Sequence, residues 1–157
     1  MTVEIERKFL LPVAPPTDQM GTGVHIRQGY LAEEEAVEVR IRTTSAGATL
    51  TVKAGKGMSR TEVDAPISVE DAQQLWPHTA GRRIDKTRHR LPLKDGSGPV
   101  AEIDVYAGAL DGLIVAEVEF SSPSEAAAFI APPWFGRELT GESGWSNAAL
   151  ARNGRPD

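Results

Sequence analysis

The chain contains no cysteine among its 157 residues, so disulfides, thiolate metal ligands and a cysteine nucleophile are excluded. Its three histidines, His25, His78 and His89, do not stand at spacings typical of a metal site. No run approaches the roughly 18 apolar residues needed to cross a bilayer, and no apolar signal segment follows Met1. A net charge of -5 argues against general nucleic-acid binding. We therefore expect a soluble cytoplasmic protein without nucleic-acid or membrane partners.

The residues that are present alternate between apolar and polar along much of the chain. At this length the chain fits a single domain over 1–157. Runs of period two, separated by Gly, Pro and Asp turns, are typical of an all-β barrel or sandwich. Ser68, Ser122 and Ser146 are candidate N-caps of short helices. The pattern predicts strands at 3–11, 25–32, 36–43, 48–54, 60–68, 84–92, 99–107 and 113–120, a loop at 12–23, turns at 45–47, 95–98 and 111–112, and helices at 69–76, 122–130 and 146–152.

The first strand carries charge on one face only. Alternate side chains of a strand share a face, so Glu4, Glu6 and Lys8 point one way while Ile5 and Phe9 point to an apolar layer. A solvated face explains any single strand of this kind. Five further strands repeat the design, however, and they sort acids and bases onto different strands. The acidic set is Glu4, Glu6, Glu102, Asp104, Glu117 and Glu119, and the basic set is Lys8, Arg40, Arg42, Lys53, Lys86, Arg88 and Arg90.

Two ligands would compensate such sets if the charged faces turn inward. Charges in a reduced dielectric are costly unless they are neutralised. Carboxylates without cysteine or paired histidines suit a hard divalent cation, Mg²⁺ or Mn²⁺. Arginine and lysine suit the oxygens of a polyphosphate. The sequence therefore predicts a metal-bound polyphosphate ligand.

These residues resemble the CYTH family of triphosphate tunnel metalloenzymes. Its amino-terminal Glu-x-Glu-x-Lys motif stands here as Glu4-Ile5-Glu6-Arg7-Lys8. Three residues of this kind occur often by chance, so the motif alone is weak. The resemblance continues in family order through 28–31, 39–42, 50–53, 86–88, 102–105, 112–120 and 134–136, nearly the whole chain.

The resemblance implies a closed eight-stranded antiparallel barrel that binds a triphosphate lengthwise with Mg²⁺ or Mn²⁺. Tyr30 and Lys86 occupy places where related enzymes have a Tyr and a Lys near the reacting phosphate. A structural role, in which the hydroxyl only anchors a hydrogen bond, fits Tyr30 equally well. Glu62 and Arg60 lie in phase with the tunnel. By the same resemblance the metal ligands are Glu4, Glu6, Glu117 and Glu119, with Asp104 and Glu102 as less certain members. The substrate-binding bases are Lys8, Arg40, Arg42, Lys53, Lys86 and Arg88.

The substrate is harder to predict than the reaction. Gln28-Gly29-Tyr30-Leu31 and a compact turn at 33–36 resemble the bacterial tripolyphosphatase branch, which favours hydrolysis of inorganic tripolyphosphate to pyrophosphate and phosphate. Thiamine triphosphatase, nucleoside triphosphatase and class IV adenylate cyclase activities are alternatives, and so is a non-catalytic module that binds polyphosphate or a nucleotide. The sequence does not predict the oligomeric state.

Overall fold

Alternating side chains build two groups of antiparallel strands, each with a charged face and an apolar face. The computed structural model describes residues 4–55, 61–94 and 98–157. Contacts within the chain divide it into two compact units, which we describe separately. Unit 1 contains residues 25–85 and 144–157, and unit 2 contains residues 2–24 and 86–143.

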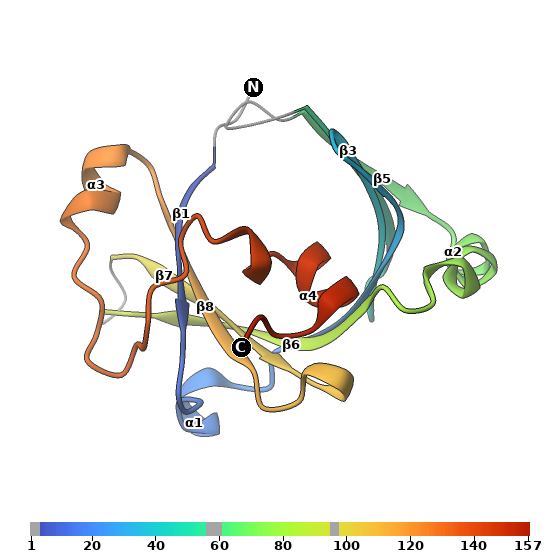
Figure 1. The fold of residues 1–157 in the computed structure, drawn as a ribbon. Coiled ribbons are helices and arrows are strands. Elements are labelled where there is room, and N and C mark those ends of the chain that lie inside the picture. Colours follow the sequence, from blue (N-terminus) through green and yellow to red (C-terminus); the bar gives the residue numbers. More distant parts are fainter. Residues whose placement is uncertain (1–3, 56–60, 95–97) are drawn as a thin grey trace. The chain divides into compact units, whose positions relative to one another are not determined.

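Unit 2 has the strand order β1-β8-β7-β6, with every described pairing antiparallel. The apolar face of these strands forms a core that also includes Met20 of α1 and Phe135. α3 packs against β1 and β8 (Figure 1). The elements are β1 (Ile5–Leu10), α1 (Thr17–Met20), β6 (Arg83–Pro92, which begins in unit 1), β7 (Val100–Tyr106), the 3₁₀ turn η2 (Gly108–Leu110), β8 (Ile114–Phe120) and α3 (Pro123–Ala128).

Unit 1 has the strand order β2-β3-β4-β5. Its apolar face packs around Ile41 and Ala48, and α2 contributes Ala72 to this core and lies against β4 (Figure 1). The Ser68 side chain caps α2 by accepting a hydrogen bond from the Asp71 backbone. The elements are β2 (Val24–Glu34, which begins in unit 2), β3 (Val37–Thr44), β4 (Gly47–Ala54), β5 (Thr61–Ile67), α2 (Val69–Leu75), η1 (Trp76–Thr79), η3 (Ser143–Trp145, which begins in unit 2) and α4 (Asn147–Asn153).

The predicted elements are largely confirmed. The fold is mainly β with eight antiparallel strands, and helices begin after Ser68, Ser122 and Ser146, each of which caps its helix. The prediction of an uninterrupted loop at 12–23 is wrong, because Thr17–Met20 forms one helical turn that places Met20 in the core. The predicted strand residues Val3 and Arg60, and the turn residues 95–97, lie outside the described residues. Closure into a barrel and the single domain stay predictions.

No helix in the described ranges is both long enough and apolar enough to span a membrane.

Candidate functional site

The strand register of unit 2 brings the predicted acids and bases onto one face. Lys8 of β1 stands opposite Glu117 of β8, which stands opposite Glu102 of β7, which stands opposite Arg90 of β6. One charged residue from each strand therefore forms a continuous cross-strand row. Ion pairs join neighbours along it: Lys8 Nζ lies 3.4 Å from Glu117 Oε1, and Arg90 Nη1 lies 3.2 Å from Glu102 Oε2.

Glu6 lies at the crowded end of this acidic group. It stands opposite Glu119 in the register, and its solvent-accessible side chain is also close to Glu117 and Glu4. Partial loss of hydration, followed by the negative charges of Glu117 and Glu4, raises the pKa of Glu6 to about 7, although the positive charge of Lys8 opposes this rise. A bound cation would relieve this repulsion.

Asp104 is hydrogen-bonded to two basic side chains. Its carboxylate accepts hydrogen bonds from Lys86 Nζ at 2.8 Å and from Arg88 Nε and Nη2 at 2.7 and 2.8 Å. The Lys86 side chain is completely buried. Burial alone would raise the pKa of Asp104, but the Arg88 hydrogen bonds and the Lys86 charge outweigh it and lower that pKa. In this arrangement Asp104 orients Lys86 and Arg88 and holds them charged, so its predicted role as a metal ligand stays a prediction.

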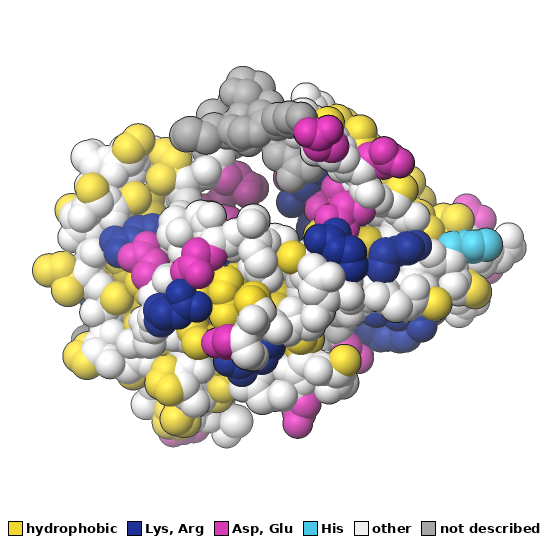
Figure 2. Space-filling model, viewed as in Figure 1, with side chains coloured by type: hydrophobic (Ala, Val, Ile, Leu, Met, Phe, Trp, Pro, Cys, Tyr) yellow, Lys and Arg dark blue, Asp and Glu magenta, His cyan; other side chains and the backbone are white. Residues whose placement is uncertain are grey.

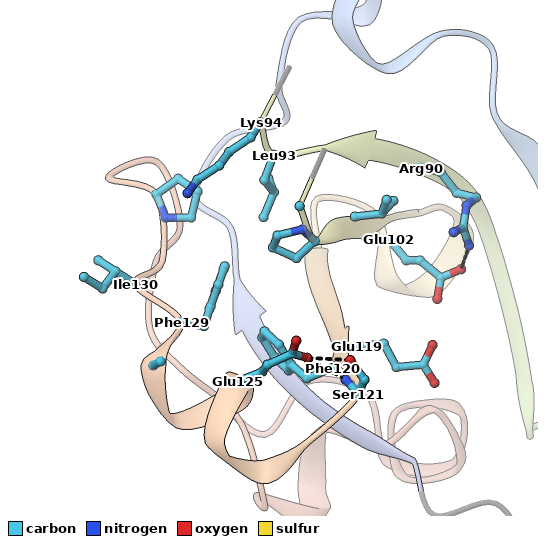
Figure 3. Close-up of a pocket in the computed structure, with 15 residues that line it drawn as sticks. Arg90, Leu93, Lys94, Glu102, Glu119, Phe120, Ser121, Glu125, Phe129 and Ile130 are labelled. Atoms are coloured by element: carbon cyan, nitrogen blue, oxygen red, sulfur yellow. Dashed lines mark hydrogen bonds and ion pairs between the residues drawn. The ribbon is translucent and has the colours of Figure 1, made fainter. Parts of the chain in front are cut away.

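A pocket of about 870 Å³ adjoins the charged face of unit 2. Glu102 and Glu119 line it together with apolar side chains that include Phe120, Phe129 and Ile130 (Figure 3). The Arg90–Glu102 pair stands at its edge. The predicted metal ligand Glu119 and the less certain ligand Glu102 therefore border a pocket whose walls are aromatic and aliphatic.

Unit 1 collects basic and polar side chains on its charged face. One cross-strand row contains Tyr30 of β2, Arg40 of β3, Thr51 of β4 and Asp64 of β5. Arg40 is only 9% exposed, and its Nε is the one buried side-chain nitrogen in the described ranges without a hydrogen-bond partner. Because a guanidinium nitrogen only donates, this site suits an anionic oxygen. Lys53 stands in the adjacent row, opposite Glu38 and Glu62.

A buried hydrogen-bonded network on the same face includes a residue that sequence reasoning missed. Gln28 Oε1 accepts a hydrogen bond of 3.0 Å from Arg42 Nε, and Gln28 Nε2 donates one of 3.0 Å to the Tyr30 hydroxyl. Burial raises the pKa of Tyr30 to about 12, and the nearby charge of Arg40 opposes the rise. The available signal was the period of two, which puts Gln28 on the same face as Tyr30.

Charged pairs also occur away from these residues. Arg7 donates to both Glu138 oxygens at 2.9 and 2.7 Å, and Arg137 donates to Glu142 at 2.8 Å. Figure 2 shows acidic and basic side chains next to one another on the face that it draws. The well-exposed Arg137–Glu142 pair contributes little to stability, and the Arg7–Glu138 pair lies outside the predicted site residues. The candidate residues differ because they combine burial, like-charge crowding or an unpaired buried donor.

The structure brings the predicted residues together in two sets. In unit 2, Lys8 and Glu117 belong to the cross-strand row that also contains Glu102 and Arg90. Glu6 and Glu119 stand opposite each other. Asp104 directly contacts Lys86 and Arg88. Acids and bases that the sequence sorts onto different strands are not kept apart in this unit, because β6 bases contact β7 acids. Unit 1 holds Tyr30, Arg40, Arg42 and Lys53. Across the described ranges, no three acidic or histidine side chains are close enough as placed to hold an ion.

The chain is similar in sequence and in fold to known proteins. The CYTH domain model matches residues 2–149. An inorganic triphosphatase of Nitrosomonas europaea is 44% identical over 94% of this chain and 96% of its own, and one of Acetivibrio thermocellus is 34% identical over 98% and 96%. A crystal structure of an inorganic triphosphatase superposes with a TM-score of 0.77 at 41% identity, covering 97% of this chain and 96% of the other. The chain belongs to the CYTH family.

Proposed function

We propose that this protein is a metal-dependent inorganic triphosphatase that hydrolyses tripolyphosphate to pyrophosphate and phosphate. The observation that carries the proposal is the near full-length similarity to two proteins named inorganic triphosphatase. The charged sheet faces supply chemistry that this reaction needs, namely oxygen ligands for a cation and donors for phosphate oxygens. The closed barrel with a lengthwise-bound triphosphate, as the resemblance implies, and a cytoplasmic location are part of the proposal.

The carboxylates of unit 2 fit a hard divalent cation, Mg²⁺ or Mn²⁺. They are oxygen donors, and the repulsion that raises the pKa of Glu6 is the condition that a cation relieves. Glu4, Glu6, Glu117 and Glu119 would hold the ion. Such an ion supplies charge stabilisation at phosphate oxygens and acidifies a bound water.

The bases bind and orient the substrate. Arg40 and Arg42 present guanidinium groups from neighbouring positions of β3, and Lys53 adds a point charge from β4. The Asp104 carboxylate fixes Lys86 and Arg88 before substrate arrives, so little reorganisation is required when charge develops on the departing phosphoryl group. No side chain needs to form a covalent intermediate.

A second candidate is hydrolysis of an organic triphosphate, and the pocket in Figure 3 favours it. Phe129, Ile130 and Leu93 offer apolar contact to a base or thiazole ring beside Glu102 and Glu119. Ile130→Ala then raises KM for ATP or thiamine triphosphate and leaves tripolyphosphate unchanged. Ile130 is 89% exposed, so the change spares the fold, and Val13→Ala is a control at a 72% exposed residue outside the pocket lining.

The test measures phosphate release from tripolyphosphate, ATP, thiamine triphosphate and pyrophosphate, with and without Mg²⁺ or Mn²⁺, and measures cyclic AMP in parallel. We expect metal-dependent turnover that is fastest with tripolyphosphate. Glu4→Gln should abolish activity through lost metal binding, whereas Arg40→Ala should mainly raise KM. Absence of metal-dependent turnover of every triphosphate would overturn the enzyme, and binding without turnover would support a receptor module.

A further inference from the structure

The hydrogen-bonding groups around Gln28 permit only one orientation of its side-chain amide. Arg42 Nε is a donor and cannot accept, so the Gln28 atom that faces it must be the carbonyl oxygen. The amide nitrogen must then face Tyr30, where it donates to the hydroxyl oxygen at 3.0 Å. The reversed amide would place two donors against each other at Arg42, at a residue with no exposed surface.

This orientation determines what the Tyr30 hydroxyl can do. Its oxygen accepts from Gln28 and from Arg40, which carries donors only. The charge of Glu38 also reaches Tyr30, but the described hydrogen bonds of the hydroxyl are those to Gln28 and Arg40. Within the described ranges, no hydrogen bond gives the hydroxyl hydrogen an acceptor. The Tyr30 side chain is 1% exposed, so bulk water does not replace one. The hydroxyl hydrogen is thus available to an acceptor brought by a ligand.

Arg40 adds a second donor with the same requirement. It is the cross-strand neighbour of Tyr30, and its buried Nε lacks a partner within the described ranges. Two adjacent buried donors without acceptors match a phosphoryl oxygen, which accepts several hydrogen bonds at once. A buried donor left unsatisfied is costly, which is typical of a site completed by its ligand.

We infer that Gln28 is a positioning residue: its amide orients the Tyr30 hydroxyl as a donor to a phosphoryl oxygen of the substrate and fixes the Arg42 guanidinium beside it. This inference rests on the proposed function. It assigns Tyr30 a binding role as hydrogen-bond donor, because a phenol whose oxygen already accepts from an amide is poorly placed to take a proton from water.

The first test does not require turnover. The chain has two tyrosines, so ¹³C labelling of the tyrosine ring gives two signals, and Tyr106→Phe identifies the one from Tyr30. Gln28→Glu replaces the donor nitrogen by an acceptor of the same shape, so the phenol changes from accepting to donating and the Tyr30 ¹³Cζ resonance shifts at pH 7.5. An unshifted resonance in folded Gln28→Glu protein would overturn the inference.

The control is Thr79→Val, another completely buried polar group of unit 1. Its hydroxyl donates to the Trp76 carbonyl and accepts from Arg83 Nε, with no bond to Tyr30. Thr79→Val should lower thermal stability while leaving the Tyr30 resonance, KM and kcat unchanged. A shift of the Tyr30 signal in this variant equal to that in Gln28→Glu would show that general loosening of unit 1 explains the result.

The second test is a double-mutant cycle with tripolyphosphate. Gln28→Met, which is uncharged and similar in length, and Tyr30→Phe should each lower kcat/KM about 10- to 100-fold, mainly through KM. The double variant should lose much less than the product of the two factors, because both changes remove the same donor. Multiplicative losses contradict the inference. Failure of the wild-type protein to hydrolyse tripolyphosphate would instead refute the proposed function, since the resonance test is independent of it.

Discussion

Asp104→Asn is expected to be among the most damaging single-atom changes in unit 2. The substitution keeps the side-chain shape but removes the negative charge that Lys86 and Arg88 share over three hydrogen bonds of 2.7–2.8 Å. Lys86 is fully buried and would face an amide, whereas Arg88 keeps a longer contact of 3.7 Å with Glu102. Removal of one partner from a buried ion pair costs about 3–5 kcal/mol, and we expect a loss in free energy of unfolding within that range.

The assay is urea unfolding of the metal-free protein, followed by the fluorescence of its three tryptophans. Glu142→Gln is the matched control, since it neutralises an acid that pairs with Arg137 while both side chains are well exposed. The control should lose about 0–1 kcal/mol. If Asp104→Asn also loses less than about 1 kcal/mol, then Asp104 does not anchor the two bases and the reasoning is wrong.

The pH dependence of this difference has a definite sign. The pKa of Asp104 is lowered by folding, so the native state binds a proton less readily than the unfolded state. Its contribution to stability is therefore complete above the unfolded value of about 3.9 and is lost as the pH falls through the lower folded pKa. The gap between wild type and Asp104→Asn should stay constant from about pH 6 to 8 and shrink only below about pH 4.

Three further outcomes are expected. Glu6→Gln should stabilise the metal-free protein at pH 8, because folding raises the pKa of Glu6 to about 7 and the charged acid destabilises the native state above that pH. This gain in stability should vanish below about pH 4.5, where the Glu6 carboxyl is protonated in both states. Mn²⁺ should raise Tm in the wild type more than in the variant. Gly29→Ala should cost about 1–3 kcal/mol in urea unfolding, because its Cβ would lie 2.6 Å from Thr79 atoms, and an unchanged midpoint would contradict this. Arg7→Lys should lose about 1–3 kcal/mol, since lysine cannot bond Glu138 and the Ala126 and Phe129 carbonyls together, and equal stability would show that these contacts contribute nothing.

The sequence predicted strands well because alternation of charged and apolar residues is a local property. The turn at 45–47 and the caps Ser68 and Ser122 are also local, and the structure has them. The helical turn Thr17–Met20 was missed because prolines and glycines surround it, and it forms where Met20 reaches the core. Tertiary packing decides such a short element, and composition does not reveal it.

The common face of the candidate residues was predictable from the sequence, but the contacts that each residue makes were not. A carboxylate in phase with Glu102 was a reasonable metal ligand, yet Asp104 is held by Lys86 and Arg88 because β6 and β7 pair in one particular register. The register between two strands cannot be predicted from the residue pattern of either strand alone. Gln28 was overlooked for a related reason: the importance of a neutral amide depends on which partners can donate and which can accept. The family prediction is confirmed by the full-length matches.

The two-faced strands of unit 2 also restrict how this protein can change length. Inserting a single residue into β8 would turn Glu117 and Glu119 toward the core around Phe9 and Ile103, and would turn Val118 toward the charged face. Burying carboxylates in the apolar core and moving an apolar side chain out of it both cost free energy, so a shifted strand is less stable on both faces. Folding intermediates with a shifted register are therefore destabilised. In unit 2, insertions and deletions should therefore be tolerated between strands and excluded within them, which makes the length of these strands as constrained as their charges.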